Sequence, residues 1–277
     1  MDILNWLYPP HCIACRQIIP AHRHREISRG VCENCEPLFV PLSGPRCAGC
    51  GHPLPQALPV KKPTATPTPP AELPVKLSTE VPQPGSVLCA SCRGASFSFA
   101  HNQAAFAYAD VVRDVIHDMK FRNSRAAAQG LGAMLAECIR DFHGADFLTP
   151  VPMHPQKQRK RGFNQAEELA RALSEKYHIP IAPALLRTVN TPPQSGLSYR
   201  GRIHNMRGVF RINPKVEVKN KNICLIDDIY TTGATLNSCA ETLMKDAQYV
   251  TCVTFSITLK KGVNFSQGID DKYLAED

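Results

Sequence analysis

Four C-x-x-C pairs in the first third of the chain restrict how this part of the protein can fold. They account for eight of the twelve cysteines: Cys12/Cys15, Cys32/Cys35, Cys47/Cys50 and Cys89/Cys92. A two-residue gap lets both thiolates of a pair reach one metal ion from a tight turn, and two such pairs complete a tetrahedral site. Four thiolates around one ion are typical of Zn²⁺, so the pairs predict one or two structural zinc ions.

The sequence leaves open which pairs share an ion, because the pairs could close in order or interleave. Sixteen residues separate Cys15 from Cys32, a spacing typical of zinc ribbons. Closure in order gives the shorter loops, so we favour 12/15 with 32/35 and 47/50 with 89/92. Four nearby histidines are expected to stay in solvent rather than bind metal: His11, His22, His24 and His52.

A proline-rich segment interrupts the cysteine region. Residues 53–84 contain ten prolines in thirty-two positions, which cannot sustain helix or sheet hydrogen bonding. We interpret the segment as an extended insertion at the tip of a zinc loop, with docking of a partner as the alternative. The expected organisation is a zinc-binding module at 1–94, a larger domain at 95–260 and a tail at 261–277.

From residue 95 onward, strand-like and helix-like blocks alternate. This alternation predicts an α/β domain with a mainly parallel sheet and helices on both faces. The strand at 222–228 is the most apolar and is expected to be central; Cys138, Cys224, Cys239 and Cys252 should be small core residues. The other strands are expected near 103–108, 146–152 and 249–259, with helices beginning near 110 and at 125–142, 163–178 and 235–247.

Two adjacent aspartates, Asp227 and Asp228, end the apolar strand, and a small, hydroxyl-rich turn follows them. Sheets of this kind bind ligands at the carboxyl edge. Small residues let backbone N–H groups surround a phosphate, and a helix N-terminus favours the anion. The carboxylates would repel that phosphate, whereas a ribose 5-phosphate can donate its hydroxyls to them. The predicted 5-phosphate site is Thr231, Thr232, Gly233, Ala234 and Thr235.

A basic segment follows the strand that ends at Val151 and should flank the same edge. It is expected to be a loop that orders on a pyrophosphate, with a solvated charged loop as the alternative. Its cations are Lys157, Arg159, Lys160 and Arg161. A second basic stretch, with Arg200, Arg202, Arg207 and Arg211, fits either a mobile catalytic flap or a nucleic-acid contact.

The stretch ICLIDDIYTTGATL, residues 223–236, closely resembles the signature with which type I phosphoribosyltransferases bind 5-phosphoribosyl 1-pyrophosphate (PRPP). Together with the start NWLYPPHCIAC and the cysteine pairs, three more segments resemble the ComF family, which includes GntX-like proteins. These segments are KFRNS (120–124), PVPMHPQKQRKRGFNQAEELA (150–170) and QSGLSYRGRIHNMRGVF (194–210). The chain departs from that pattern in its proline-rich insertion and acidic tail.

The resemblance implies a zinc finger followed by a phosphoribosyltransferase domain, associated with DNA uptake in natural transformation. PRPP would then be the substrate, and Asp227 and Asp228 would be catalytic carboxylates that orient its ribose. Mg²⁺ would be bound largely by oxygens of PRPP and by water. The acceptor is unidentified, and His154 and His204 are candidate bases by position only.

A rival hypothesis makes the chain a non-enzymatic factor that binds single-stranded DNA within the DNA-uptake machinery, with PRPP as a regulatory ligand. The net charge of +8 favours anionic partners of either kind, and the 7% aromatic content favours contacts with the nucleic-acid backbone. The zinc module could also be only a brace for the larger domain. Neither a secretory signal nor a run of about 18 apolar residues is found, which predicts a cytoplasmic protein without membrane insertion.

Overall fold

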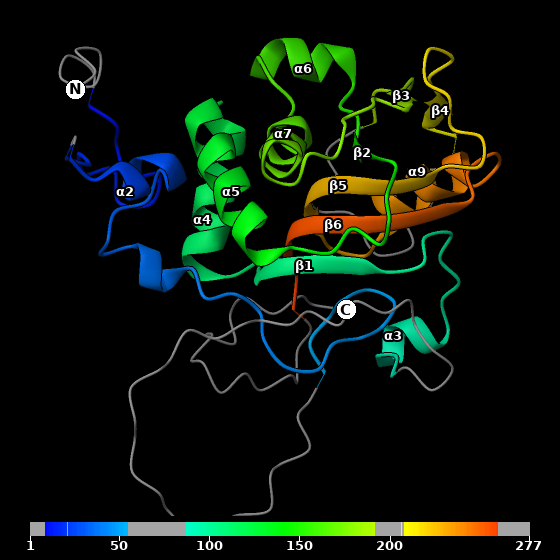
Figure 1. Cartoon of the computed structure of the whole chain (residues 1–277), viewed down its shortest axis with the longest axis horizontal. Helices are drawn as coiled ribbons and strands as arrows, with labels where there is room; N and C mark the ends of the chain where they lie inside the picture. Colours follow the sequence, from blue (N-terminus) through cyan, green and yellow to red (C-terminus); the bar gives the residue numbers. More distant parts are fainter. Residues whose placement is uncertain (1–8, 21, 55–86, 192–205, 207, 260–277) are drawn as a thin grey trace, which may run out of the picture.

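The computed structural model describes residues 9–20, 22–54, 87–191, 206 and 208–259. Its centre is a four-stranded parallel sheet with the strand order β1-β6-β5-β2 (Figure 1). The strands are β1 (Asn102–Ala107), β2 (Phe147–Pro150), β5 (Asn222–Tyr230) and β6 (Tyr249–Ile257). The parallel sheet and the interior position of the most apolar strand are confirmed.

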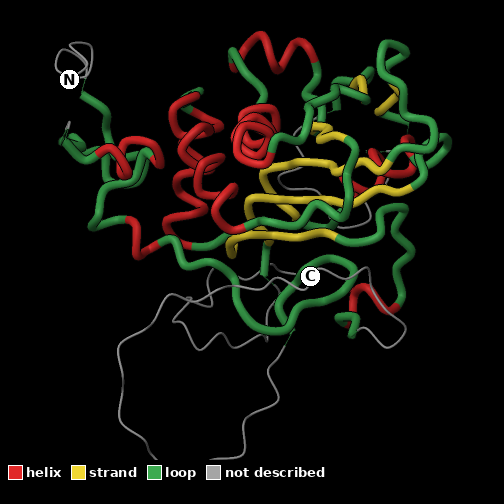
Figure 2. The backbone as a smooth tube through the Cα atoms, viewed as in Figure 1, coloured by secondary structure: helices red, strands yellow, loops and turns green. Residues whose placement is uncertain are grey.

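Helices cover both faces of the sheet (Figures 1 and 2). One face packs against α4 (Asp110–Phe121), α5 (Arg125–Cys138) and α7 (Gln165–Tyr177), and the other against α9 (Ala234–Leu243). Alternate side chains of β5 pack against the helices of opposite faces, because successive strand residues point in opposite directions. Cys224 and Ile226 pack with the three-helix layer, whereas Leu225 packs with α9.

The three-helix layer follows from apolar spacing and from caps. The buried face of α4 is Val112, Val115, Ile116 and Met119, which confirms the expected face. Ser124 caps α5 by accepting a hydrogen bond from the N–H of Ala127 at 3.2 Å, and Asn164 caps α7 in the same way. In α5, a Cβ at Gly132 would lie 2.9 Å from the Cβ of Ala172, so glycine permits the close approach of α5 and α7.

Several element boundaries differ from the expected ones. The helix expected at 125–142 ends at Cys138. Strand β5 continues past the two aspartates, because Ile229 and Tyr230 still pair with Ser256 and Ile257 of β6. The antiparallel pair of β3 (Leu185–Arg187) and β4 (Phe210–Ile212) was not predicted, since strands of three residues carry little periodicity.

The remaining elements are short. They are α2 (His24–Arg29), η1 (Glu36–Leu38), α3 (Ala90–Arg93) and α6 (Pro155–Arg161). Most of the proline-rich insertion and the C-terminal tail lie outside the described residues. In the core, Cys224, Cys239 and Cys252 are fully buried and Cys138 is half-buried, as expected for small core residues. No helix in the described ranges is long and apolar enough to span a membrane.

Candidate functional site

Two groups of four cysteine sulfurs gather at separate places. Within each group the four Sγ atoms all lie within 4.8 Å of one another. The groups are Cys12, Cys15, Cys32 and Cys35, and Cys47, Cys50, Cys89 and Cys92. This confirms closure in order, and four thiolates in a compact group fit tetrahedral Zn²⁺.

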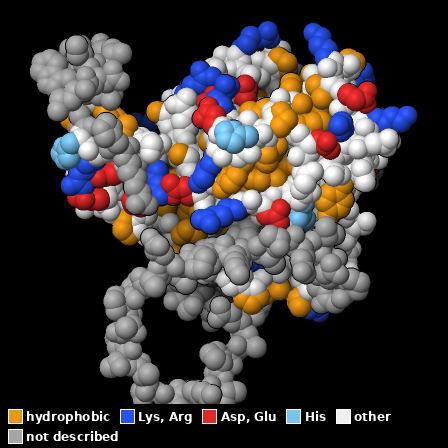
Figure 3. Space-filling view, in the orientation of Figure 1, with side chains coloured by type: hydrophobic (Ala, Val, Ile, Leu, Met, Phe, Trp, Pro, Cys, Tyr) orange, Lys and Arg blue, Asp and Glu red, His pale blue; other side chains and the backbone are white. Residues whose placement is uncertain are grey.

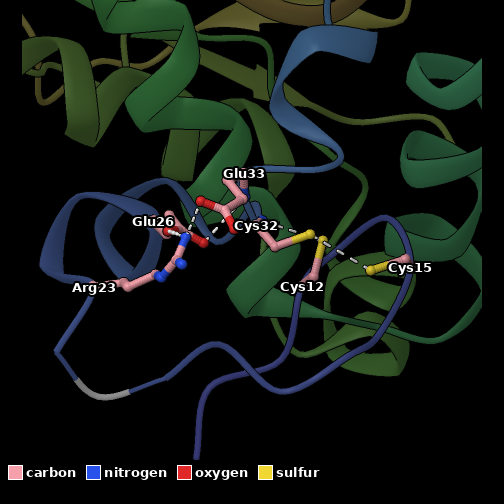
Figure 4. A network of polar contacts seen from close by, with 6 residues as sticks. All are labelled: Cys12, Cys15, Arg23, Glu26, Cys32 and Glu33. Atoms are coloured by element: carbon pink, nitrogen blue, oxygen red, sulfur yellow. Dashed lines mark hydrogen bonds and ion pairs between the residues drawn. The ribbon is translucent and has the colours of Figure 1, made fainter.

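Backbone amides support the thiolate form in both groups. The N–H of Cys32 donates to Sγ of Cys12 at 3.4 Å, and the N–H of Cys89 donates to Sγ of Cys47 at 3.2 Å. Burial alone would raise the pKa of Cys12, but amide donors, foremost that of Cys32, lower it to about 7. Figure 4 shows the sulfur atoms of Cys12, Cys15 and Cys32 facing one another. Zinc binds the thiolate, so these donors favour metal binding.

The histidines do not join the cysteine groups in the described part of the chain. His11 and His22 are exposed, as expected. His52 is an exception to the expected solvent exposure: it is buried, and its Nδ1 lies 2.8 Å from the carbonyl oxygen of Pro53. His52 is therefore buried without joining the second cysteine group.

Charged contacts attach the first cysteine group to the helical layer. Arg29, at the end of α2, is buried and forms ion pairs with both Glu36 and Glu137, the latter on α5. Arg16, in the turn after the first cysteine pair, forms an ion pair with Asp118 of α4. The first group therefore lies beside α4 and α5, where Figure 1 shows α2.

The second cysteine group lies against the opposite face of the sheet. Its buried members, Cys47, Cys50 and Cys92, share a hydrophobic cluster with side chains of α9. At the start of β1, the side-chain amide of Asn102 donates to the carbonyl of Cys50 at 3.1 Å. The first group thus packs with the helical layer on one face of the sheet, and the second group packs in the cluster on the other face.

The two aspartates lie near the carboxyl end of β5. The backbone N–H of Asp228 donates to Oδ1 of Asp227 at 2.9 Å. The ammonium group of Lys120, near the end of α4, lies 2.8 Å from Oδ2 of Asp228, which is 9% exposed. Burial, and next the charge of Asp228, raise the pKa of Asp227 to about 7.

The turn after β5 has the small, tight geometry that the sequence predicted. Gly233 has a φ of 78°, and a Cβ there would lie 2.5 Å from the hydroxyl oxygen of Tyr230. Oγ1 of Thr232 accepts a hydrogen bond from the N–H of Ala234 at 3.3 Å, at the first residue of α9. Thr231 is exposed and Thr235 is half-buried. The five residues therefore surround the N-terminus of one helix at the sheet edge.

The basic segment forms a helix rather than the expected loop. His154 caps α6, since its Nδ1 accepts from the N–H of Gln156 at 3.3 Å, and Gly162 ends the helix with a φ of 84°. This cap gives the His154 ring a structural role. Lys157 and Arg161, one helical turn apart, are half-buried.

The four cations of α6 therefore fall into two pairs. Arg159 and Lys160 are exposed, and Figure 3 shows Lys and Arg side chains projecting from the molecule over α6. Burial lowers the pKa of Arg161, and the nearby carboxylate of Asp228 partly offsets this effect. Arg161 thus lies near Asp228, Lys157 donates from Nζ to the carbonyl oxygen of Thr191 at 2.6 Å, and the outer pair faces solvent.

Sequence reasoning missed two cations at this site. Lys120 lies in the KFRNS segment, which was noted only as part of a family resemblance. Burial lowers the pKa of Arg187, on β3, and the nearby Cys239 and Asp227 only partly oppose this effect. Its Nε is buried without a hydrogen-bond partner among the described residues, and its guanidinium lies 5.6 Å from the ring centre of Phe210. No motif marks Arg187, so only the fold reveals it.

Part of the predicted site lies outside the described residues. This applies to Arg200, Arg202, His204 and Arg207. Arg211 is exposed on β4. Both interpretations of this basic stretch, as a catalytic flap or as a nucleic-acid contact, stay predictions.

The model of a family described as "Double zinc ribbon domain" matches residues 3–64, which include three of the four cysteine pairs. The chain is 31% identical to "Competence protein F" of Haemophilus influenzae, over 50% of this chain and 64% of that protein. It is 28% identical to "Competence protein ComFC" of Bacillus subtilis, over 58% of this chain and 65% of that protein. The predicted resemblance to the ComF group is confirmed.

The chain spans less than two thirds of the length of each relative named here. "DNA utilization protein YhgH" of Escherichia coli is 30% identical over 50% of this chain and 63% of that protein. Among solved structures, a purine phosphoribosyltransferase from Pyrococcus horikoshii aligns with a TM-score of 0.29 and 20% identity, covering 51% of this chain and 77% of that one. A likeness this distant says nothing about the chemistry of the site.

Proposed function

We propose that the carboxyl edge of the sheet binds PRPP with Mg²⁺, and that this ComF-like chain transfers its 5-phosphoribosyl group to an acceptor not yet identified. One observation carries the proposal: two adjacent carboxylates lie between a glycine-containing turn at a helix N-terminus and a set of inward cations. The turn begins at Thr231, and Lys157 and Arg161 supply the inner cations of α6. A ligand that fits must carry hydroxyl groups between two anionic ends, as PRPP does.

The parts of the ligand are assigned by charge. Asp227 and Asp228 accept hydrogen bonds from the ribose hydroxyls, and the turn at 231–235 binds the 5-phosphate. Lys157 and Arg161 bind the pyrophosphate, and the inward Lys120 and Arg187 add positive charge beside the carboxylates.

The reaction breaks the bond between the anomeric carbon and a pyrophosphate oxygen, and a nucleophilic atom of the acceptor forms the new bond. Positive charge develops on the ribose in the transition state. The carboxylates stabilise that charge, and the cations stabilise the departing pyrophosphate. In the described residues only the cysteine groups gather three or more metal-ligating side chains. Mg²⁺ would therefore be bound mainly by PRPP and water, and would neutralise the leaving group.

A second candidate function is binding of single-stranded nucleic acid, which relatives named for competence and DNA utilization support. Phe121 is 73% exposed at the end of α4, and its ring stacks on His117 with 4.1 Å between ring centres. An exposed ring pair of this kind can stack with bases. The outward Arg159 and Lys160 would supply contacts with the nucleic-acid backbone.

The enzymatic proposal is tested by pyrophosphate release. Zinc-replete protein is incubated with PRPP and Mg²⁺, with and without pools of nucleobases, nucleosides and single-stranded DNA. We expect release that Asp228→Asn lowers at least tenfold and that the exposed control Asp114→Asn leaves unchanged. Binding of PRPP without release under any condition would reduce the chain to a PRPP-binding protein.

A further inference from the structure

Tyr230 lies between the phosphate turn and the second cysteine group. It is the last residue of β5, is 5% exposed, and lies directly under the turn. A Cβ at Gly233 would be 2.5 Å from its hydroxyl oxygen and 2.9 Å from its ring. The position of the turn is therefore set by the ring of Tyr230.

Tyr230 shares its hydrophobic surroundings with the second cysteine group. Tyr230 belongs to the same buried cluster as Cys50 and Cys92. The ring of Tyr230 therefore lies in the hydrophobic cluster that also contains cysteines expected to bind the second zinc ion.

The segment that follows Cys92 also contacts Tyr230 and α9. Phe99, seven residues after Cys92, packs edge-to-face on Tyr230 with 6.5 Å between ring centres. The neighbouring Ser98 donates its backbone N–H to Oδ1 of Asn237 in the first turn of α9, at 2.7 Å. The segment that leaves the second cysteine group therefore contacts both Tyr230 and the helix that follows the turn.

The first cysteine group offers an internal comparison. Its cysteines pack with α4 and α5 in the cluster on the other face of the sheet. Among the described contacts, its charged links run to Glu137 and Asp118 rather than to the turn. The two zinc sites therefore differ in their relation to the ligand.

We propose that Tyr230 is a positioning residue that couples zinc binding at the second cysteine group to phosphate binding at the turn. The inference rests on the proposed function, since the phosphate is that of PRPP. Zinc fixes the segment that follows Cys92, whose Phe99 packs on the ring of Tyr230, and the turn at 231–235 lies against the same tyrosine side chain. Coupling between two binding equilibria is reciprocal, so PRPP must strengthen zinc binding at the second group as much as zinc strengthens PRPP binding.

Zinc release to a coloured chelator tests the coupling in the full chain. Zinc loss is followed with and without saturating PRPP and Mg²⁺. Zinc release from the first group is identified with Cys15→Ser, which removes an exposed ligand of that group and should alter only its part of the time course. We expect PRPP to slow release from the second group at least fivefold and to leave the first group unchanged. Asp227→Asn, which should not bind PRPP, controls for chelation of zinc by PRPP itself.

Two variants separate the ring of Tyr230 from its hydroxyl. Tyr230→Phe keeps the ring and should keep the protection. Tyr230→Leu should lower PRPP affinity about tenfold and abolish the protection while both zinc ions remain bound. If Tyr230→Leu does not fold, the wild-type release experiment still decides the matter.

The outcomes distinguish the two proposals. PRPP binding that leaves zinc release at both groups unchanged, or slows it equally at both, overturns the coupling and leaves the proposed function standing. Absence of PRPP binding by calorimetry overturns both.

Discussion

The ammonium nitrogen of Lys120 lies 2.8 Å from Oδ2 of Asp228, which joins the end of α4 to the carboxyl end of β5. The Lys120 side chain is 28% exposed and that of Asp228 is 13% exposed, so the ion pair is largely shielded from water. A shielded pair costs more to break than an exposed one, because the remaining charge loses its partner in a poorly solvated place. This pair fixes the carboxylate against which the ribose of PRPP would bind.

Removing one partner of this pair should destabilise the protein. Lys120→Ala should lower the free energy of unfolding by about 1–3 kcal/mol, the usual loss when a buried charged hydrogen bond is broken. In Lys120→Ala/Asp228→Asn the cost should be less than the sum of the two single costs. Denaturant unfolding of the three variants measures the coupling, with the exposed Lys245→Ala as control. Additive costs would show that the pair is not a stabilising contact.

The raised pKa of Asp227 predicts a pH-dependent stability. A carboxyl whose pKa rises from its ordinary value to about 7 on folding binds a proton more tightly in the folded state. Stability is therefore lost as pH increases from about 4 to 7, and above pH 7 the ionised group carries its full cost. Asp227→Asn removes this cost and should stabilise the protein at pH 8 by on the order of 2 kcal/mol, because partial solvation reduces the effect.

The measurement is thermal unfolding of Asp227→Asn and wild type at pH 5 and pH 8. The difference in stability should be larger at pH 8. Asp114→Asn, on the exposed face of α4, should show no such change. A difference that is equal at the two pH values would contradict the raised pKa.

The turn should not tolerate a side chain at Gly233. Gly233→Ala requires a positive φ from alanine and also places a methyl group against Tyr230, so PRPP affinity should fall at least tenfold. Gly144 also has a positive φ, of 65°, but a Cβ added there would have nothing within 4 Å, so Gly144→Ala is the control. Calorimetry with both variants separates backbone strain from displacement of the turn; equal loss in both would refute the placement of the phosphate.

The two pairs of cations on α6 should behave differently. Lys157→Ala and Arg161→Ala should each weaken PRPP binding about tenfold, since an inward cation contacts the pyrophosphate. Arg159→Ala and Lys160→Ala should change PRPP binding less than twofold. If the chain also binds single-stranded DNA, replacing Arg159 or Lys160 by alanine should weaken that binding and reduce its dependence on salt. Equal effects of all four variants on PRPP would contradict the division.

The sequence sufficed where the signal was local. The C-x-x-C spacing fixes two ligands per turn, and shorter loops favour closure in order, which the structure confirms. The alternation of strand and helix patterns located every strand of the parallel sheet. The aspartates and the turn were found together because all of them lie in one stretch of fourteen residues, 223–236.

The sequence failed where a feature depends on contacts between distant segments or on weak local signals. The high charge of the basic segment predicts a loop. The N-cap at His154 and the C-cap at Gly162 nevertheless allow it to form a helix. Lys120 is more than one hundred residues from Asp228, and no pattern links them. Arg187 lies on a strand of three residues, too short for a periodic signal.

The central claim is that Asp227 and Asp228 form part of a PRPP site. The most direct test is calorimetric titration of zinc-replete protein with PRPP and Mg²⁺, beside Asp227→Asn/Asp228→Asn. We predict micromolar binding by the wild type that the double variant loses while it keeps its zinc and its fold. Equal binding by the two proteins, or none by the wild type, would contradict the account.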